Sequence, residues 1–157
     1  MQKITPFLWF DGNGEEAINF YISIFKNSKI RNITRHRGEM PDRKGTMISA
    51  TFQLDGQEFM ALNGGPQFTF SQAISFFVSC ETQEEVDDLW EKLSYGGEKQ
   101  RCGWLKDQYG VSWQIIPSVL SEMLNDLDTE KSQRVMNAMF QMDKIDIEGL
   151  TQAYKQK

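Results

Sequence analysis

The sequence predicts an α+β fold in which two βαβββ modules are followed by a helical tail. The first observation is the order strand, helix and three strands, which occurs over residues 1–66 and again over 67–117. The second is a similarity between the helix sequences of the two modules, which is typical of an internal duplication. The third is a change to helical spacing over residues 118–157. We therefore predict a domain of residues 1–117 followed by a helical extension.

The composition is that of a globular chain. Its 157 residues suit one domain, and 39% of them are apolar, enough for a core. Asp and Glu number 22 against 17 Lys and Arg, which disfavours a nucleic-acid partner because phosphates require a basic face. We find neither a signal peptide nor a run of roughly 20 apolar residues that could span a membrane. Cys80 and Cys102 are too few for a disulfide framework, so we expect a cytoplasmic protein with no membrane partner.

Local patterns place the elements of the first module. Apolar side chains recur at helical spacing over Glu15–Phe25, and two glutamates occupy the first turn, which predicts a helix. Asp55-Gly56 is a hairpin signal that returns the chain into the next strand. The strands predicted in this module are Ile4–Phe10, Ile30–His36, Thr46–Leu54 and Glu58–Asn63.

The second module repeats this pattern. Thr82 is predicted to cap a helix over residues 82–93, with Glu85 completing a capping box. The predicted strands are Ala73–Cys80, a segment near Glu98–Arg101, Trp104–Lys106 and Val111–Ile116. The similarity between the two helices is found by aligning Glu15-Glu16-Ala17 with Glu84-Glu85-Val86. This alignment places Phe20-Tyr21 opposite Leu89-Trp90.

Three helical stretches are predicted in the tail, over residues 118–127, 128–142 and 146–154. The second carries an apolar, Met-rich side, and such faces fill irregular surfaces. Its members are Val135, Met136, Met139, Phe140 and Met142. Two interpretations remain open, since a helix is stabilised by whatever its apolar face packs against. The tail packs on its own domain, or it docks on the other subunit of a dimer or covers a pocket.

Several strings of the chain resemble a known family. They are FDGNGEEAINFY, GGEKQRCGWLKDQYGVSWQIIP and, in the tail, MNAMFQMDKIDIEGL. Together with the two modules they resemble the glyoxalase superfamily, or vicinal oxygen chelate fold. Within it they are similar to the PhnB-like branch, often labelled as a 3-demethylubiquinone-9 3-methyltransferase family. The resemblance implies sheets that curl into an open barrel around a pocket, and it implies a homodimer.

Metal-dependent members of that superfamily hold a divalent ion with four His, Gln or Glu side chains, one each from the first and last strands of both modules. Carried over to this chain, the resemblance places the four positions at or near Pro6, at Ala61, at Ala73 or Ser75, and at Gln114. Asn63, two residues after Ala61, is expected to face the same way. One neutral amide cannot replace several anionic or imidazole donors, so we expect no metal and no cofactor.

Two other side chains suggest chemistry, and each has a plainer interpretation. His36, the only histidine, is a general base or a surface residue beside a charged loop. The cations around it could guide an anionic small molecule or form a solvated face. Cys102 is a nucleophile only if its pKa is lowered, and otherwise a small buried hydrophobe. In both cases we favour the plainer interpretation.

Gly12-Asn13-Gly14-Glu15-Glu16-Ala17 matches the GxGxxA pattern of a dinucleotide site. The two glutamates oppose a phosphate at that helix N-terminus, and the hairpins downstream differ from the parallel crossovers of a dinucleotide fold. The same argument weakens the methyltransferase label, because the sequence shows no glycine-rich turn that could bind S-adenosylmethionine.

These observations leave three hypotheses. The first is a metal-free protein that binds a small, partly apolar molecule in its barrel pocket, where few polar groups lie in an apolar cleft. The second is an enzyme of the same superfamily that acts on an antibiotic, a phosphonate or a quinone precursor. The third is a dimeric structural protein without a ligand. The residues predicted to bind the ligand are Asn63, Ser75, Phe77, Cys102, Trp104 and Gln114.

Overall fold

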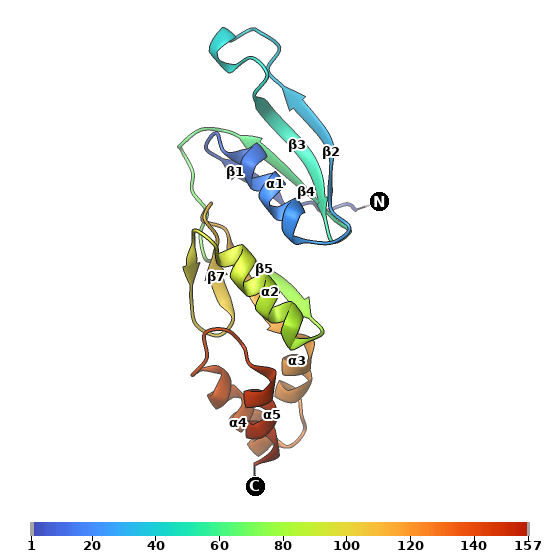
Figure 1. Ribbon diagram of the computed structural model, residues 1–157, viewed down its shortest axis with the longest axis vertical. Helices are drawn as coiled ribbons and strands as arrows, with labels where there is room; N and C mark the ends of the chain where they lie inside the picture. Colours follow the sequence, from blue (N-terminus) through green and yellow to red (C-terminus); the bar gives the residue numbers. More distant parts are fainter. Residues whose placement is uncertain (1, 157) are drawn as a thin grey trace. The chain divides into compact units, whose positions relative to one another are not determined.

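The computed structural model describes residues 2–156, and over them it contains both predicted βαβββ modules and the helical tail (Figure 1). The chain forms two compact units, one that ends at Phe70 and one that begins at Ser71. No described helix has the length and apolar character needed to cross a membrane.

The first unit is a four-stranded open sheet with a helix on one face (Figure 1). Its strand order is β1-β4-β3-β2, in which β1 and β4 are parallel and the remaining pairs antiparallel. The helix buries Ala17, Ile18 and Tyr21, whereas Phe20, Ile24 and Phe25, which also fit the helical spacing, are only half-buried. The elements are β1 (Phe7–Phe10), α1 (Gly14–Ile24), β2 (Lys29–Arg35), the short 3-10 turn η1 (Pro41–Arg43), β3 (Met47–Leu54) and β4 (Gln57–Asn63).

The second unit contains a sheet of the same topology. Its order is β5-β8-β7-β6, again with the first and last strands of the module parallel at adjacent positions. The elements are β5 (Ser75–Cys80), α2 (Gln83–Ser94), β6 (Glu98–Lys99), β7 (Trp104–Lys106) and β8 (Ser112–Pro117). The predicted cap of α2 is confirmed, because Thr82 accepts a hydrogen bond from the Glu85 N–H. The predicted α+β repeat is therefore confirmed, as two open sheets.

The helical tail packs on the second unit of its own chain. Its helices are α3 (Ser118–Leu124), α4 (Thr129–Met139) and α5 (Ile147–Lys155). Together they enclose a separate apolar core that also includes the end of β8. The buried members are Ile116, Leu120, Met123, Val135, Ile145 and Leu150. Of the two interpretations left open by the sequence, the structure shows packing within the chain.

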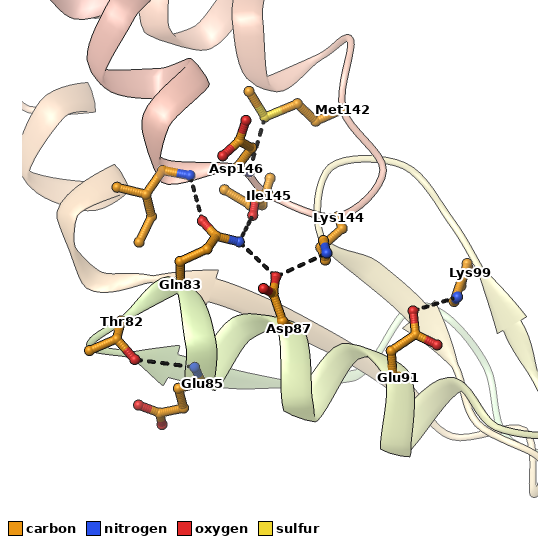
Figure 2. Close-up of polar contacts among 11 residues, drawn as sticks. Thr82, Gln83, Glu85, Asp87, Glu91, Lys99, Met142, Lys144, Ile145 and Asp146 are labelled. Carbon is orange, nitrogen blue, oxygen red and sulfur yellow. Dashed lines mark hydrogen bonds and ion pairs between the residues drawn. The ribbon is translucent and has the colours of Figure 1, made fainter.

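Gln83, in the first turn of α2, ties the tail to the module (Figure 2). Its Nε2 donates to the carbonyl of Ile145 at 3.0 Å and to Asp87 Oδ1 at 2.9 Å. Its Oε1 accepts from the Ile147 N–H at 2.7 Å, which satisfies one of the free donors at the start of α5. Lys144 forms an ion pair with Asp87 at 2.9 Å. One side chain thus bridges elements more than sixty residues apart.

Element boundaries differ slightly from the sequence prediction. The first strand begins at Phe7 rather than Ile4, because Pro6 has no N–H to add to a ladder. β6 ends at Lys99, two residues before the predicted limit. β8 runs one residue further, to Pro117, which pairs with Cys80.

Candidate ligand-binding face

α2 covers one face of the second sheet (Figure 1), and the opposite face, on which Phe77 is exposed, is the open face. Alternation along β8 buries Trp113 and Ile115 on the covered side and directs Gln114 to the open side. Gln114 lies directly between Trp104 on β7 and Phe77 on β5 in the strand register. Directly paired residues share a face, so three predicted site residues form a row across three strands. Phe77 is 55% exposed, which leaves an aromatic surface open on this row.

Ser75 lies on the same face in the adjacent row, two residues before Phe77, and adds a second polar group. Gln114 Nε2 donates a hydrogen bond to Ser75 Oγ at 2.9 Å. This bond orients the amide, since it fixes which end of Gln114 faces the serine. The structure therefore brings together Ser75, Phe77, Trp104 and Gln114, which the sequence predicted as separate members of one site.

Ser112 belongs to the same face, although sequence reasoning missed it. It lies two residues before Gln114 on β8 and pairs directly with Ser75 and with Lys106. Its side chain is buried, with 1% of the residue exposed, and its hydroxyl has no hydrogen-bond partner among the described residues. The signal was available, because residues two apart on a strand face the same way.

The turn before β8 is held by a buried carboxylate. Asp107 is 2% exposed, and its Oδ1 accepts from the N–H groups of Tyr109 and Val111 at 2.9 and 3.0 Å. Its Oδ2 accepts from Trp113 Nε1 at 2.9 Å. Gly110 has a φ of +90°, which L side chains rarely adopt. This network sets the direction in which β8 leaves the turn and hence the face on which Gln114 lies.

Asn63 lies in the first unit and contacts the helix. Its Oδ1 accepts from the Gly14 N–H at 2.8 Å, and its Nδ2 donates to the Met47 carbonyl at 3.1 Å. A Cβ on Gly14 would lie 2.7 Å from Asn63 Oδ1, so this glycine permits a close approach. The GxGxxA pattern thus has a structural explanation, because Asn63 already satisfies the helix N-terminus where a phosphate would bind.

The face assigned to Ala61 from the sequence requires a correction. Ala61 is 0% exposed and pairs with Leu8 and Ala50, both buried, on the side of the sheet that α1 covers. The open side of β4 carries Met60 and Leu62 instead. The error arises because Phe59, Met60, Ala61 and Leu62 are all apolar, so alternation cannot identify the buried face.

Cys102 lies outside the row formed by Trp104, Gln114 and Phe77. Its N–H donates to the Met142 carbonyl at 2.9 Å, and its Sγ lies 3.6 Å from the Met139 carbonyl. Its φ of 61° is unusual for a residue with a side chain. These contacts attach the start of β7 to the tail. The predicted roles of Asn63 and Cys102 in binding stay predictions.

The charged hairpin around His36 is partly used for structure. Arg35, on β2, forms a bidentate ion pair with Glu15 of α1, at 2.8 and 2.7 Å. The hydrogen bond from Arg35 lowers the pKa of Glu15. His36 Nδ1 lies 2.8 Å from Glu39 Oε1. One of the cations that suggested an anion site, Arg35, is therefore already paired, and His36 has a carboxylate neighbour.

The residues on the open faces do not fit a divalent metal site. β1 and β4 present Phe7, Trp9, Met60 and Leu62, and β5 and β8 present Ser75 and Gln114 near the expected positions. None of these is a carboxylate, imidazole or thiolate donor. Among residues 2–156 no three His, Cys, Asp or Glu side chains are grouped so that they could share an ion.

Two open sheets of identical strand order, each built from a βαβββ module, define a protein of the glyoxalase fold class. Residues 2–116 match the family described as 3-demethylubiquinone-9 3-methyltransferase, and the chain belongs to this family. It is 45% identical to a PhnB protein from Bacillus cereus, with a TM-score of 0.70, over 74% of this chain and 100% of that one. The chain is thus a PhnB-like member of the glyoxalase superfamily.

More distant structures share the fold alone. Protein PA1353 from Pseudomonas aeruginosa is 22% identical, with a TM-score of 0.60, over 72% of this chain and 95% of that one. The fosfomycin resistance protein FosX from Listeria monocytogenes, solved with Mn(II) and sulfate, is 14% identical with a TM-score of 0.50, over 72% of this chain and 89% of that one. No curated protein matches the chain.

Proposed function

We propose that this PhnB-like protein binds a small, uncharged, partly apolar molecule on the open face of its second sheet, without a metal. The observation that carries the proposal is the row Trp104–Gln114–Phe77, in which one amide lies between two aromatic side chains. Ser75 supplies a second polar group, held by the hydrogen bond from Gln114. Few polar groups on an apolar surface are the usual composition of a small-molecule site.

A ligand screen tests this proposal. Dicarbonyls, quinones and hydrophobic drugs are added in excess, and a ligand that binds the folded state raises the Tm. For each hit, Phe77→Ala should weaken binding, because truncating it removes an exposed aromatic contact. Tyr95→Ala is the matched control, since Tyr95 is also an exposed aromatic residue of this unit but lies at the end of α2. A screen without hits, or hits insensitive to Phe77→Ala, would contradict the proposal.

The enzyme hypothesis is separated from binding by turnover. The family description names a methyltransferase reaction, but the helix N-terminus in the GxGxxA segment is used by Asn63. We therefore favour binding. Incubating a confirmed hit with the protein, with and without S-adenosylmethionine, and following it by mass spectrometry distinguishes the two. Conversion that requires the protein would favour the enzyme.

A cytoplasmic homodimer is part of the same proposal, and it rests on the resemblance to PhnB-like proteins. Size-exclusion chromatography with light scattering gives the mass directly. A mass near twice the 18.2 kDa of the chain supports the dimer, and a monomer at micromolar concentration contradicts it.

A further inference from the structure

The open face of the second sheet carries a hydroxyl that the protein itself does not use. Ser112 is 1% exposed, and its Oγ makes no hydrogen bond within the described part of the chain. A buried polar group without a partner destabilises a folded protein, so such groups are rare and often have a functional reason. Ser112 is adjacent to the proposed site, because it pairs with Ser75 and lies two residues from Gln114.

The single hydrogen bond between Gln114 and Ser75 determines which groups remain for a ligand. Gln114 Nε2 is the donor and Ser75 Oγ the acceptor, at 2.9 Å. The Ser75 hydroxyl therefore retains its proton for donation, and Gln114 Oε1 retains its acceptor capacity. Together with the Ser112 hydroxyl, the face therefore offers two O–H donors, from Ser75 and Ser112, beside one acceptor, Gln114 Oε1.

Opposite charges lie side by side at the edge of this face. Lys106 lies directly opposite Ser112 on β7, and Glu98 lies directly opposite Lys106 on β6. The acidic neighbour weakens the attraction of Lys106 for an anion, so this edge favours an anionic ligand less than a lone lysine would. The neighbouring row is aromatic: Trp104 and Phe77 flank Gln114 on both sides, about 5 Å away per strand. A flat ring fits this row better than a flexible or charged molecule.

We propose that the ligand is an uncharged, planar cyclic amide (a lactam) and that Ser112 is a specificity-determining residue. This inference rests on the proposed binding function. The carbonyl oxygen of such a ligand accepts from the Ser112 and Ser75 hydroxyls, while its adjacent N–H donates to Gln114 Oε1. The ring lies along Trp104 and Phe77. Because Ser112 is 1% exposed, binding at its hydroxyl requires neighbouring side chains to move aside.

Three probes of similar shape test the hydrogen-bond pattern by isothermal titration calorimetry. Carbostyril is a planar lactam with adjacent N–H and C=O groups, N-methylcarbostyril lacks the donor, and naphthalene lacks both groups. We expect carbostyril to bind about tenfold more tightly than N-methylcarbostyril, and naphthalene to bind most weakly. Chemical-shift changes of the Gln114 side-chain amide in NMR should accompany carbostyril binding and locate it on this face.

Ser112→Ala provides a second and independent measurement. It should weaken carbostyril binding about fivefold or more, leave naphthalene binding unchanged and raise the Tm of the ligand-free protein, because it removes an unsatisfied hydroxyl. Ser79→Ala is the matched control, since Ser79 is an exposed serine on β5 that faces the same way as Ser75. It should change neither affinity nor Tm.

The outcomes separate the two proposals. If none of the three probes binds and the wider ligand screen also has no hits, the proposed function fails and this inference fails with it. If the probes bind with equal affinity, or if hits of the wider screen bind while carbostyril does not, binding stands and the lactam class is overturned. A fall in Tm for Ser112→Ala would show that the hydroxyl is already satisfied, which contradicts its role. The comparison of carbostyril with N-methylcarbostyril uses the unmodified protein, so it holds even if a variant fails to fold.

Discussion

The backbone N–H of Gly14 donates a hydrogen bond to Asn63 Oδ1 at 2.8 Å, which joins the start of α1 to the end of β4. The same side chain donates to the Met47 carbonyl at 3.1 Å, next to the start of β3. Asn63 therefore connects three elements of the first unit. This arrangement explains an asparagine in a position that the sequence assigned to ligand binding.

Replacing Asn63 should destabilise the first unit. Asn63→Ala removes both hydrogen bonds, and the loss of a helix N-terminal acceptor costs about 1–2 kcal/mol. Asn63→Asp keeps the acceptor but loses the donor to Met47, so its effect should be smaller. Urea unfolding measures both. Asn137→Ala, on the exposed side of α4, is the control and should change the free energy of unfolding little. Equal stability of Asn63→Ala and the unmodified protein would contradict the capping role.

Asp107 should be among the residues whose loss costs most stability. Asp107→Ala removes the buried acceptor of three hydrogen bonds, which the backbone N–H groups of Tyr109 and Val111 and the indole N–H of Trp113 donate. Each unsatisfied buried donor costs about 1–3 kcal/mol, and relaxation of the turn reduces the sum, so we expect a loss of about 3 kcal/mol. The fluorescence of Trp113 should change as well. Asp128→Ala, which removes the exposed N-cap of α4, is the comparison and should cost less. A loss below that of Asp128→Ala would show that the network is not stabilising.

The contact made by Gln83 should control how firmly the tail is attached. Gln83→Ala removes the acceptor of the Ile147 N–H and the donor to the Ile145 carbonyl, so the Ile147 amide should exchange its hydrogen about tenfold faster. Gln83→Glu keeps the acceptor but sets a second carboxylate beside Asp87. It should therefore loosen the tail partly, and more so at neutral than at acidic pH. Hydrogen exchange read by mass spectrometry measures both variants.

Gln133→Ala is the control for this experiment, because Gln133 makes an exposed i,i+4 hydrogen bond with Asn137 inside α4. Unchanged exchange at Ile147 in Gln83→Ala would show that the apolar core alone holds the tail. That core includes Ile116 and Leu150.

Burial should make Cys80 inert and give stability a dependence on alkaline pH. Burial, with smaller contributions from Glu85 and Glu81, raises the pKa of Cys80 to about 12. The unfolded thiol ionises at a pH of about 8.5, so between these values the unfolded state binds fewer protons than the folded one. The contribution of Cys80 to the free energy of unfolding is therefore complete below the pH at which the unfolded thiol ionises. It is lost as the pH rises from there toward 12. The free energy of unfolding should fall more steeply in this range than in Cys80→Ala.

Alkylation by iodoacetamide at pH about 8 provides a direct check, since only the thiolate reacts. Cys80, which is 0% exposed, should react only when the protein unfolds. Using the Cys102→Ser variant ensures that the measured alkylation comes from Cys80. Rapid alkylation of the folded protein would show that Cys80 is accessible.

Divalent metal ions should not bind at Gln114. Mn²⁺, Ni²⁺ or Zn²⁺ should leave the Tm unchanged, because the open faces offer amide, hydroxyl and apolar groups but no anionic donor set. Gln114→Glu adds one carboxylate without its partners and should not create a site of micromolar affinity. Elemental analysis that finds a stoichiometric ion, lost in Gln114→Ala, would overturn this prediction.

Much of the fold and part of the candidate site could be predicted from local sequence. Thr82 and Glu85 identified the start of α2, and Asp55-Gly56 identified the hairpin between β3 and β4. Short-range signals suffice for these features because capping and turn conformations depend on nearby residues. The grouping of Ser75, Phe77, Trp104 and Gln114 followed from the resemblance, and strand alternation alone would have added Ser112.

The sequence by itself determined the order of the elements and their amphipathic sides. Only the tertiary structure decided which face of β4 is buried, because four consecutive apolar residues satisfy either choice. It also decided where the tail packs, since an apolar helix face is stabilised by any apolar partner and the contact of Gln83 with Ile147 spans 64 residues. Asn63 shows the same limit, because its amide suits a ligand or a helix N-terminus and only the fold shows that it accepts a hydrogen bond from the Gly14 N–H.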